Sequence, residues 1–191
     1  MTLLKFLSFM VTLSVLAFSS TEESCLKLNT CVCVFSNKSV VDLWPVDGSS
    51  TEPSFTQIPE AEGRVFEWNP CTPFSTDVSG CNNVTSCQRT LAENFPAGTA
   101  DTTFSVDSED NIVITYGASK GPDNLWRQTE ITLRCDPDKP GKGTIPRLTG
   151  TILPSAHALY TGTFTSKFAC AFPTHQTLPG DPVQQKDEVI I

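Results

Sequence analysis

Residues 127–135 read Arg-Gln-Thr-Glu-Ile-Thr-Leu-Arg-Cys, and this stretch decides the fold class. Thr129, Ile131 and Leu133 alternate with polar residues, which is the pattern of a strand with one buried face and one solvated face. A turn-forming segment with two prolines and two glycines follows at residues 136–143. We therefore expect a β-strand over residues 128–134 that ends in a turn.

Short β-favouring segments lie on both sides of this strand, separated by turn residues. They are residues 31–35, 40–44, 64–68, 102–106, 112–116, 147–153, 158–163 and 167–172. Only residues 88–94 lean toward a helix, of one or two turns. Many short strands at close spacing predict an all-β fold, a flattened β-barrel or sandwich with at most one short helix.

The length and charge of the chain narrow its possible functions. The chain has 191 residues, which fits one domain of ordinary size with appendages. Its formal net charge is -8, from 13 Lys and Arg against 21 Asp and Glu. Such a negative field repels phosphate backbones and anionic lipid surfaces, so nucleic acid is excluded as a partner class.

The N-terminus has the pattern of a cleaved signal peptide. Met1–Lys5 carries one positive charge, Phe6–Phe18 is largely apolar, and small residues stand at the two positions that a signal peptidase recognises. We expect a signal peptide over residues 1–19, a β domain over 20–172 and a disordered tail over 173–191. No other segment is long enough for a transmembrane helix, so we expect a secreted or luminal protein of the endoplasmic reticulum, Golgi or endolysosomal system.

Eight cysteines follow the expected cleavage site, and an even number in an oxidising compartment predicts four disulfides. They are Cys25, Cys31, Cys33, Cys71, Cys81, Cys87, Cys135 and Cys170. Zinc is disfavoured because Cys31-Val-Cys33 lacks the two-residue spacer that is common in zinc sites. Two sequons, at Asn37 and Asn83, predict N-glycosylation in this compartment.

No constellation of catalytic residues is present in the sequence. The chain has two histidines, His157 and His175, and both lie between Asp138 and Asp181. No Asp or Glu occurs between those two positions, so neither histidine has an acidic residue near it in sequence to orient it as a base. It has neither a G-x-S-x-G elbow nor an H-E-x-x-H motif. We therefore expect a protein that is not an enzyme and that uses no cofactor and no metal.

Five groups of residues occur in a characteristic order between Cys33 and Cys170. They are Val41–Val46 (Val-Asp-Leu-Trp-Pro-Val), Phe66–Phe74 (aromatic-x-x-Asn-x-Cys-x-Pro), Cys87-Gln88, Arg127–Cys135, and Tyr160 with Phe168-Ala169-Cys170. In these motifs the chain resembles the mannose 6-phosphate receptor homology (MRH) domain, a lectin-like module. The resemblance implies a flattened barrel of two crossed antiparallel sheets.

Members of that family hold mannose with a Gln, an Arg, a Glu and a Tyr. The resemblance implies that Gln88, Arg127 and Tyr160 contact a sugar here, and charged partners give sugar hydroxyls the stronger hydrogen bonds. The family's Glu position corresponds to Gly150, so that carboxylate is missing. One family disulfide is missing as well, because its two positions hold Pro122 and Ala158.

Each of the three side chains also has an ordinary structural interpretation. Gln88 can begin a short helix after a disulfide, and Tyr160 can be a core aromatic with a bonded hydroxyl. Arg127 can pair with Glu130 or with an acidic turn. The sequence leaves these interpretations open beside the sugar-binding one.

The resemblance also implies a cysteine pairing. It joins Cys33 to Cys71, Cys81 to Cys87 and Cys135 to Cys170, which leaves Cys25 and Cys31 to pair with each other. An exchange of Cys31 and Cys33 in this scheme is open too, because residues two apart on a strand face the same side.

Two functions follow from the resemblance. The first is a secreted or luminal carbohydrate-binding module that recognises mannose-type N-glycans, with an affinity lowered by the missing Glu. The second is a domain of the same fold that has lost sugar binding and serves in protein–protein interaction or as a structural unit. The expected partners are therefore glycoprotein N-glycans or a protein.

Overall fold

The structure, a computed structural model, describes residues 24–77 and 80–173. The expected signal peptide over 1–19 and all but the first residue of the expected tail over 173–191 lie outside these residues. Within the described ranges, no helix has the length and apolar character needed to cross a membrane.

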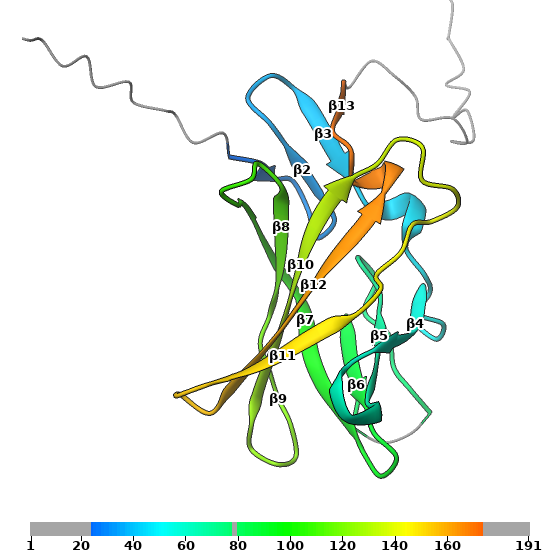
Figure 1. Ribbon diagram of the computed structural model, residues 1–191, viewed down its shortest axis with the longest axis vertical. Helices are drawn as coiled ribbons and strands as arrows, with labels where there is room; N and C mark the ends of the chain where they lie inside the picture. The colour runs from blue at the N-terminus through cyan, green and yellow to red at the C-terminus, as the bar shows by residue number, and fades with distance from the viewer. Residues whose placement is uncertain (1–23, 78–79, 174–191) are drawn as a thin grey trace, which may run out of the picture.

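The described chain folds into two β-sheets (Figure 1). The smaller sheet has the strand order β1-β2-β3-β13, with β1 (Leu26–Lys27), β2 (Val32–Val34), β3 (Ser39–Asp42) and β13 (Phe172–Pro173). The larger sheet has the order β11-β12-β10-β8-β7-β6-β5-β4, and β9 pairs with β10. The larger sheet is strongly curled, so its two ends approach each other.

The strands of the larger sheet are short except for β7, β10 and β12. They are β4 (Phe55–Pro59), β5 (Val65–Trp68), β6 (Ser86–Arg89), β7 (Asn94–Val106), β8 (Ile112–Gly117), β9 (Ser119–Lys120), β10 (Trp126–Cys135), β11 (Leu148–Leu153) and β12 (His157–Ser166). Three single-turn 3-10 helices complete the described elements: η1 (Trp44–Val46), η2 (Ala61–Gly63) and η3 (Lys167–Ala169). The expected all-β fold with four disulfides is confirmed.

Strand β10 has the alternation that its sequence predicts. Arg127, Thr129, Ile131 and Leu133 are buried on the concave side of the sheet, and the residues between them are more exposed. An aromatic cluster fills the concave side further along. Its members are Phe55, Trp68, Tyr116 and Phe164, with neighbouring ring centroids 5.1–6.4 Å apart. Ring contacts of this kind add to the area that the core buries.

One strand pair departs from the antiparallel arrangement. Strands β10 and β12 are parallel, and their register sets Arg127 opposite Ala158 and Thr129 opposite Tyr160. Because alternate residues of a strand face the same side, Arg127 and Tyr160 both point into the concave side of the sheet. The parallel pairing therefore brings two of the expected sugar-binding residues near each other.

The expected helix over residues 88–94 is wrong. Residues 86–89 form β6, and a tight turn leads directly into β7. The hydroxyl of Thr90 closes this turn by accepting hydrogen bonds from the backbone N–H groups of Ala92 and Glu93, at 3.3 and 3.0 Å. A Thr side chain that satisfies nearby backbone donors offers an alternative to helix formation.

The expected strand over residues 167–172 is also wrong, except at its last residue, Phe172. Residues 167–169 form η3, because the Ser166 side chain accepts a hydrogen bond from the backbone N–H of Phe168 and starts a helical turn. Only Phe172–Pro173 of this segment is a strand.

The cysteine pairing corrects the expectation at the N-terminus. The disulfides join Cys25 to Cys33, Cys31 to Cys71, Cys81 to Cys87 and Cys135 to Cys170. The expected Cys33–Cys71 and Cys25–Cys31 bonds are therefore wrong, and the exchanged scheme that the sequence left open is correct. Antiparallel pairing of β1 with β2 sets Lys27 opposite Cys33, and this pairing brings Cys25 close to Cys33. Cys31 is then available to pair with Cys71.

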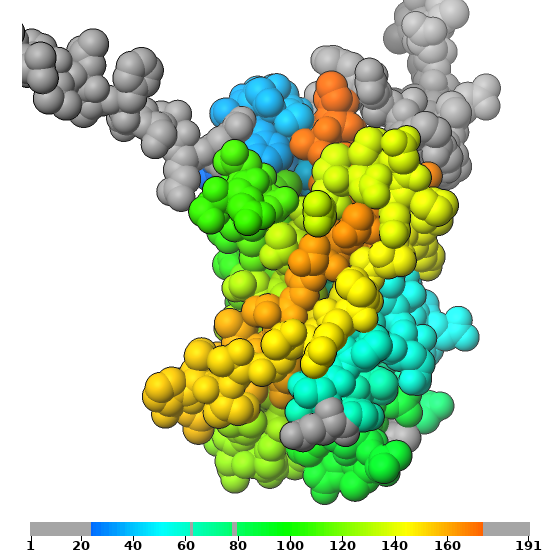
Figure 2. All heavy atoms as spheres, in the orientation of Figure 1, coloured from blue at the N-terminus to red at the C-terminus, as the bar shows by residue number. Residues whose placement is uncertain are grey.

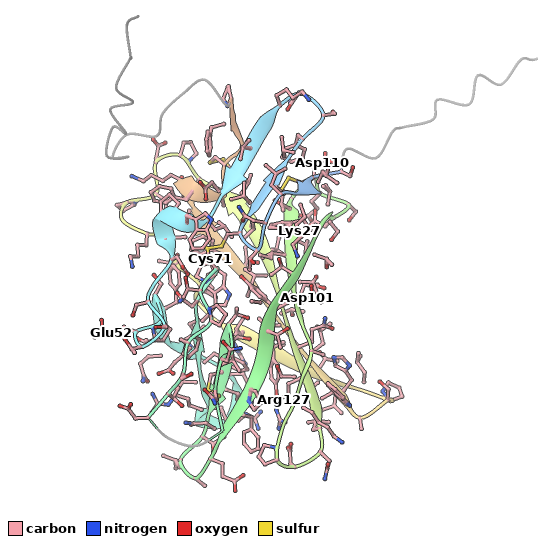
Figure 3. All side chains as sticks on the ribbon, turned by 180° about the vertical axis from the view of Figure 1, so that it is seen from behind. Lys27, Glu52, Cys71, Asp101, Asp110 and Arg127 are labelled. Carbon is pink, nitrogen blue, oxygen red and sulfur yellow. A yellow bond between two sulfur atoms is a disulfide. The ribbon has the colours of Figure 1, made fainter. Side chains whose placement is uncertain are left out.

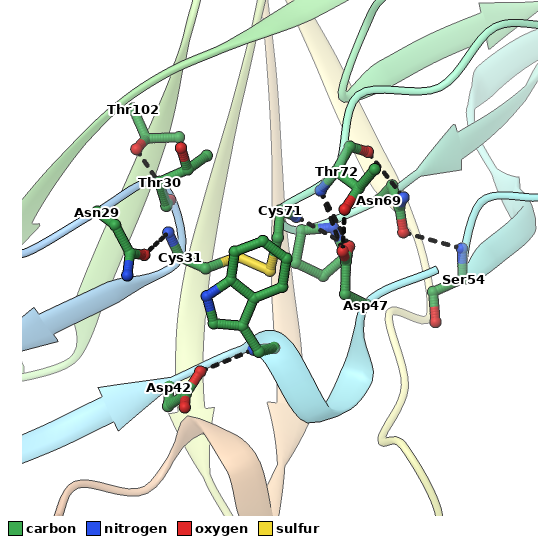
Figure 4. Close-up of a disulfide and its surroundings, with 12 residues drawn as sticks. Asn29, Thr30, Cys31, Asp42, Asp47, Ser54, Asn69, Cys71, Thr72 and Thr102 are labelled. Atoms are coloured by element: carbon green, nitrogen blue, oxygen red, sulfur yellow. Dashed lines mark hydrogen bonds between the residues drawn. A yellow bond between two sulfur atoms is a disulfide. The ribbon is translucent and has the colours of Figure 1, made fainter. Parts of the chain in front are cut away.

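A buried polar cluster surrounds the Cys31–Cys71 disulfide (Figure 4). The Asn69 side chain accepts from the backbone N–H of Gly48 and of Ser54, and it donates to two carbonyl oxygens, at 2.6–3.2 Å. The Asp47 carboxylate accepts from the backbone N–H groups of Cys71 and Thr72. These bonds fix the end of β5 against the loop after η1, and with the disulfide they join the two sheets.

Candidate functional site

The curl of the larger sheet gathers Gln88, Arg127 and Tyr160 from β6, β10 and β12. The Tyr160 hydroxyl donates to Gln88 Oε1 at 3.2 Å. The three residues are only 3%, 5% and 4% exposed. Arg127 lies toward the end of the molecule away from the smaller sheet (Figure 3). The structure thus brings together all three residues that the motif resemblance predicts to bind a sugar.

The guanidinium of Arg127 is held from two sides. It lies over the ring of Phe95, with its Cζ atom 4.2 Å from the ring centroid. Its Nη1 and Nη2 donate to the two carboxylate oxygens of Asp123 at 2.8 and 2.7 Å, and Nη1 also reaches the carbonyl of Leu125 at 3.4 Å. Arg127 therefore pairs with an acidic turn and not with Glu130, which was the other partner considered from the sequence.

Glu60 is a fourth member of this cluster, and the motif resemblance did not predict it. It precedes η2 and is only 8% exposed. Gln88 Nε2 lies 3.4 Å from Glu60 Oε2, and Arg64 donates to both carboxylate oxygens. The resemblance points to a carboxylate on the strand before Tyr160, whereas Glu60 reaches the site from the opposite end of the sheet.

Glu60 lies next to the position where the family's carboxylate is missing. A Cβ atom added at Gly150 would lie 3.2 Å from Glu60 Oε1 and 2.8 Å from Tyr160 Cε1. Figure 2 shows the same approach on the surface, where the yellow strand β11 lies against the teal segment around β4 and β5. The absence of a side chain at Gly150 thus leaves room for the ring of Tyr160, and the Glu60 carboxylate lies beside that ring.

The cluster perturbs the pKa values of its members. Burial raises the pKa of Tyr160, although the positive charge of Arg127 acts in the opposite direction. Burial acts to lower the pKa of Arg127, but Asp123 and Tyr160 more than offset it, so the pKa is raised. Hydrogen bonds from Arg127 hold the pKa of Asp123 below its usual value. Arg127 and Asp123 are therefore charged and Tyr160 is neutral at neutral pH.

Two buried polar atoms at the site have no hydrogen-bond partner. They are Arg127 Nε and Ser119 Oγ, and the two residues lie opposite each other on β10 and β9. Buried polar groups in folded proteins are nearly always hydrogen-bonded, and exceptions often mark a place where water or a ligand binds. The cluster therefore retains donors for a further hydroxyl group.

An open pocket lies beside the cluster. It has a volume of about 380 Å³ and is lined by Gly63, Arg64, Thr90, Leu91 and Ala92. Arg64 lines the pocket and also binds Glu60, so the pocket and the buried cluster share one residue. Leu91, at the tip of the β6–β7 turn, is fully exposed.

The other expected site residues have simple positions. Asn37 and Asn83 are both exposed, as a glycan acceptor must be, while the hydroxyl of Thr85 in the second sequon bonds to the carbonyl of Thr99 at 3.2 Å. N-glycosylation at both positions stays a prediction. Within residues 24–77 and 80–173, no group of three or more His, Cys, Asp or Glu side chains is placed to hold a metal ion.

Comparisons with known proteins give a likeness among solved structures and none among sequences. No family model matches the sequence, and no curated protein matches it. Among solved structures, chicken IGF2R domain 11 matches with 15% identity and a TM-score of 0.48, over 70% of this chain and 85% of that domain.

Proposed function

We propose that the chain is a carbohydrate-binding module of the secretory pathway that recognises mannose-type N-glycans and performs no chemistry on them. One observation carries this proposal. An amide, a guanidinium, a phenol and a carboxylate, from four segments far apart in the chain, gather in one cluster with buried donors still unbonded. The four disulfides fit the oxidising compartment in which N-glycans occur.

The chemistry of the cluster suits a neutral sugar. A sugar hydroxyl both donates and accepts, so it is held best where acceptors and donors lie side by side. Glu60 supplies carboxyl acceptors, Arg127 supplies a charged donor, and Gln88 and Tyr160 can each do both. Hydrogen bonds with one charged partner are about twice as strong as neutral ones.

Glu60 takes the role of the carboxylate that is missing at Gly150 in this proposal. Its carboxylate touches the Gln88 amide and lies beside the space next to Tyr160. The affinity lost with the family's Glu is then restored from a different segment, between β4 and η2.

A specific observation favours the second candidate function, a domain that has lost sugar binding. Gln88, Arg127, Tyr160 and Glu60 are each at least nine-tenths buried, and each already bonds within the chain. In this candidate function the cluster stabilises the curled sheet, and the surface of the domain binds a protein.

A glycan array distinguishes the two candidates. We expect the wild-type chain to bind mannose-terminated glycans and Arg127→Ala to lose that binding. Arg134→Ala is the matched control, because Arg134 lies on the same strand but is exposed, and we expect it to bind as wild type does. A wild-type chain that binds no glycan, while both variants fold, would favour the protein-binding candidate.

A further inference from the structure

We propose that the turn between β9 and β10, residues 121–125, is a gate for the sugar site, and that Asp123 is its latch. In the closed state the Asp123 carboxylate occupies the Arg127 donors that a sugar hydroxyl would otherwise take. Binding then requires Asp123 to release Arg127. The identity of the ligand rests on the proposed function, whereas the opening of the turn does not.

The first support is that Arg127 is already fully engaged on its outer side. Both terminal nitrogens bond to Asp123, and Nη1 also lies 3.4 Å from the carbonyl of Leu125. Only Nε lacks a partner, and it is buried. A ligand that approaches from solvent therefore meets a guanidinium whose terminal donors are occupied by the chain itself.

The second support is a difference in exposure between the two carboxylates at the site. The side chain of Asp123 is 39% exposed, whereas that of Glu60 is 2% exposed. When this ion pair opens, water solvates the released Asp123 carboxylate, and the ligand's hydroxyl groups take its place on Arg127, which is 5% exposed and would otherwise be a buried, unpaired charge. Removing Glu60 from its partners would instead leave a buried charge unpaired. The Asp123 side of the cluster is therefore the side that opens.

The third support is the construction of the turn. It is short and self-contained: the backbone N–H of Gly121 donates to the carbonyl of Leu125 at 2.9 Å, and that of Asn124 donates to the carbonyl of Gly121 at 3.0 Å. The turn can therefore swing as a unit.

Gly121 makes the closed state possible. A Cβ atom at this position would lie 2.6 Å from Arg127 Nη1 and 2.7 Å from Asp123 Oδ1. Real Cβ atoms essentially never come so close to other atoms, so any larger residue would push the ion pair apart. The glycine therefore allows the latch to lie flat against the backbone of the turn.

A site whose competent state is only partly populated binds its ligand more weakly, in proportion to that population. Weakening the latch should therefore strengthen binding. Asp123→Asn keeps the oxygen that accepts from the backbone N–H of Leu125 but removes the charge. We expect the affinity for a mannose-terminated oligosaccharide to rise about two- to fivefold, because a neutral amide bonds to Arg127 more weakly than a carboxylate does and so competes less with a sugar hydroxyl.

Two measurements report on the gate without any glycan. In Asp123→Asn we expect faster hydrogen exchange at the amides of residues 121–125 and faster modification of Arg127 by phenylglyoxal, read by peptide mass spectrometry. Asp136→Asn is the matched control, because Asp136 also accepts from the N–H two residues further on in an exposed turn. It should change neither measurement. Gly121→Ala, which separates the pair by steric contact, should act as Asp123→Asn does.

The outcomes separate the gate from the proposed function. Unchanged exchange and unchanged Arg127 reactivity in both Asp123→Asn and Gly121→Ala would overturn the gate. A fall in glycan affinity in Asp123→Asn would also overturn it, since Asp123 would then position Arg127 for the ligand. If no variant binds glycan but Arg127 becomes more reactive, the gate stands and the proposed function fails.

Discussion

Gly150 and Glu60 depend on each other. A Cβ atom at position 150 would lie 2.8 Å from the ring of Tyr160 and 3.2 Å from Glu60 Oε1, so a larger residue there would displace the ring and crowd the carboxylate. Conversely, because Gly150 has no side chain, Glu60 is the residue that supplies a carboxylate neighbour to Gln88. The loss at one position and the gain at the other are therefore two parts of one arrangement.

Glu60→Gln tests this arrangement at the level of one atom. The amide removes the charge and one acceptor, so we expect glycan affinity to fall at least about tenfold, the size of a lost charged hydrogen bond. Glu67→Gln is the matched control, because Glu67 is similarly buried and pairs with Arg89 at 2.5 Å on the other face of β5. Isothermal titration with a mannose-terminated oligosaccharide should show a loss in the first variant only. Equal losses in both would contradict a role for Glu60 in binding.

The two tyrosines of the chain predict its behaviour at high pH. Tyr116 and Tyr160 are both buried, and burial raises the pKa of each above the usual value of 10.0. A raised pKa means that the folded state holds the proton more tightly, so the stability gained is present below pH 10 and is lost as pH rises beyond it. We expect no phenolate absorbance at 295 nm near pH 10, and its appearance together with unfolding at higher pH. Titration of either tyrosine near pH 10 in the folded protein would contradict its burial.

At the level of elements, the disulfides differ in the length of the loop that each one closes. Cys31–Cys71 joins residues 40 apart, and Cys81–Cys87 joins residues 6 apart. Loop entropy predicts that removing the first costs about 4 kcal/mol of unfolding free energy and removing the second about 2 kcal/mol. Urea denaturation of the two Cys→Ala double variants tests this. All four cysteines are at most 3% exposed, so the packing loss is comparable; an equal cost for both pairs would contradict the entropic account.

The sequence predicts elements well where polar and apolar residues alternate strictly, as in β10, and poorly elsewhere. Strand β4 was not expected, because a register shift between Phe55 and Ile58 and a positive φ at Gln57 interrupt its alternation. The start of β7 was missed as well, since Pro96 and Gly98 are read as turn residues in a sequence but lie within this strand. Local patterns cannot show that a neighbouring strand holds such residues in place.

At the scale of the whole molecule, three of the four residues in the cluster could be predicted and one could not. Gln88, Arg127 and Tyr160 occupy motif positions, so their meeting was expected. Glu60 lies in no motif, and it reaches Gly150 only because the curled sheet brings β4 and β11 together. Such long-range closure is a property of the folded sheet and leaves no local signal.

The net charge of -8 predicts how glycan binding responds to salt. A neutral sugar releases no counterions, so we expect its affinity to change less than about twofold between 50 and 500 mM NaCl. A phosphorylated mannose glycan should bind no more tightly than the neutral one, because the acidic surface repels its phosphate. Surface plasmon resonance with both glycans at two salt concentrations checks this. Tighter, salt-sensitive binding of the phosphorylated glycan would contradict it.

Strands β1 and β13, near the two ends of the described chain, belong to the same four-stranded sheet. This sheet lies at the far end of the molecule from Arg127 (Figure 3). A carrier protein or neighbouring module joined directly before β1 or after β13 would thus be attached away from Arg127. A domain immobilised through this sheet would keep its Arg127 end turned toward the solution.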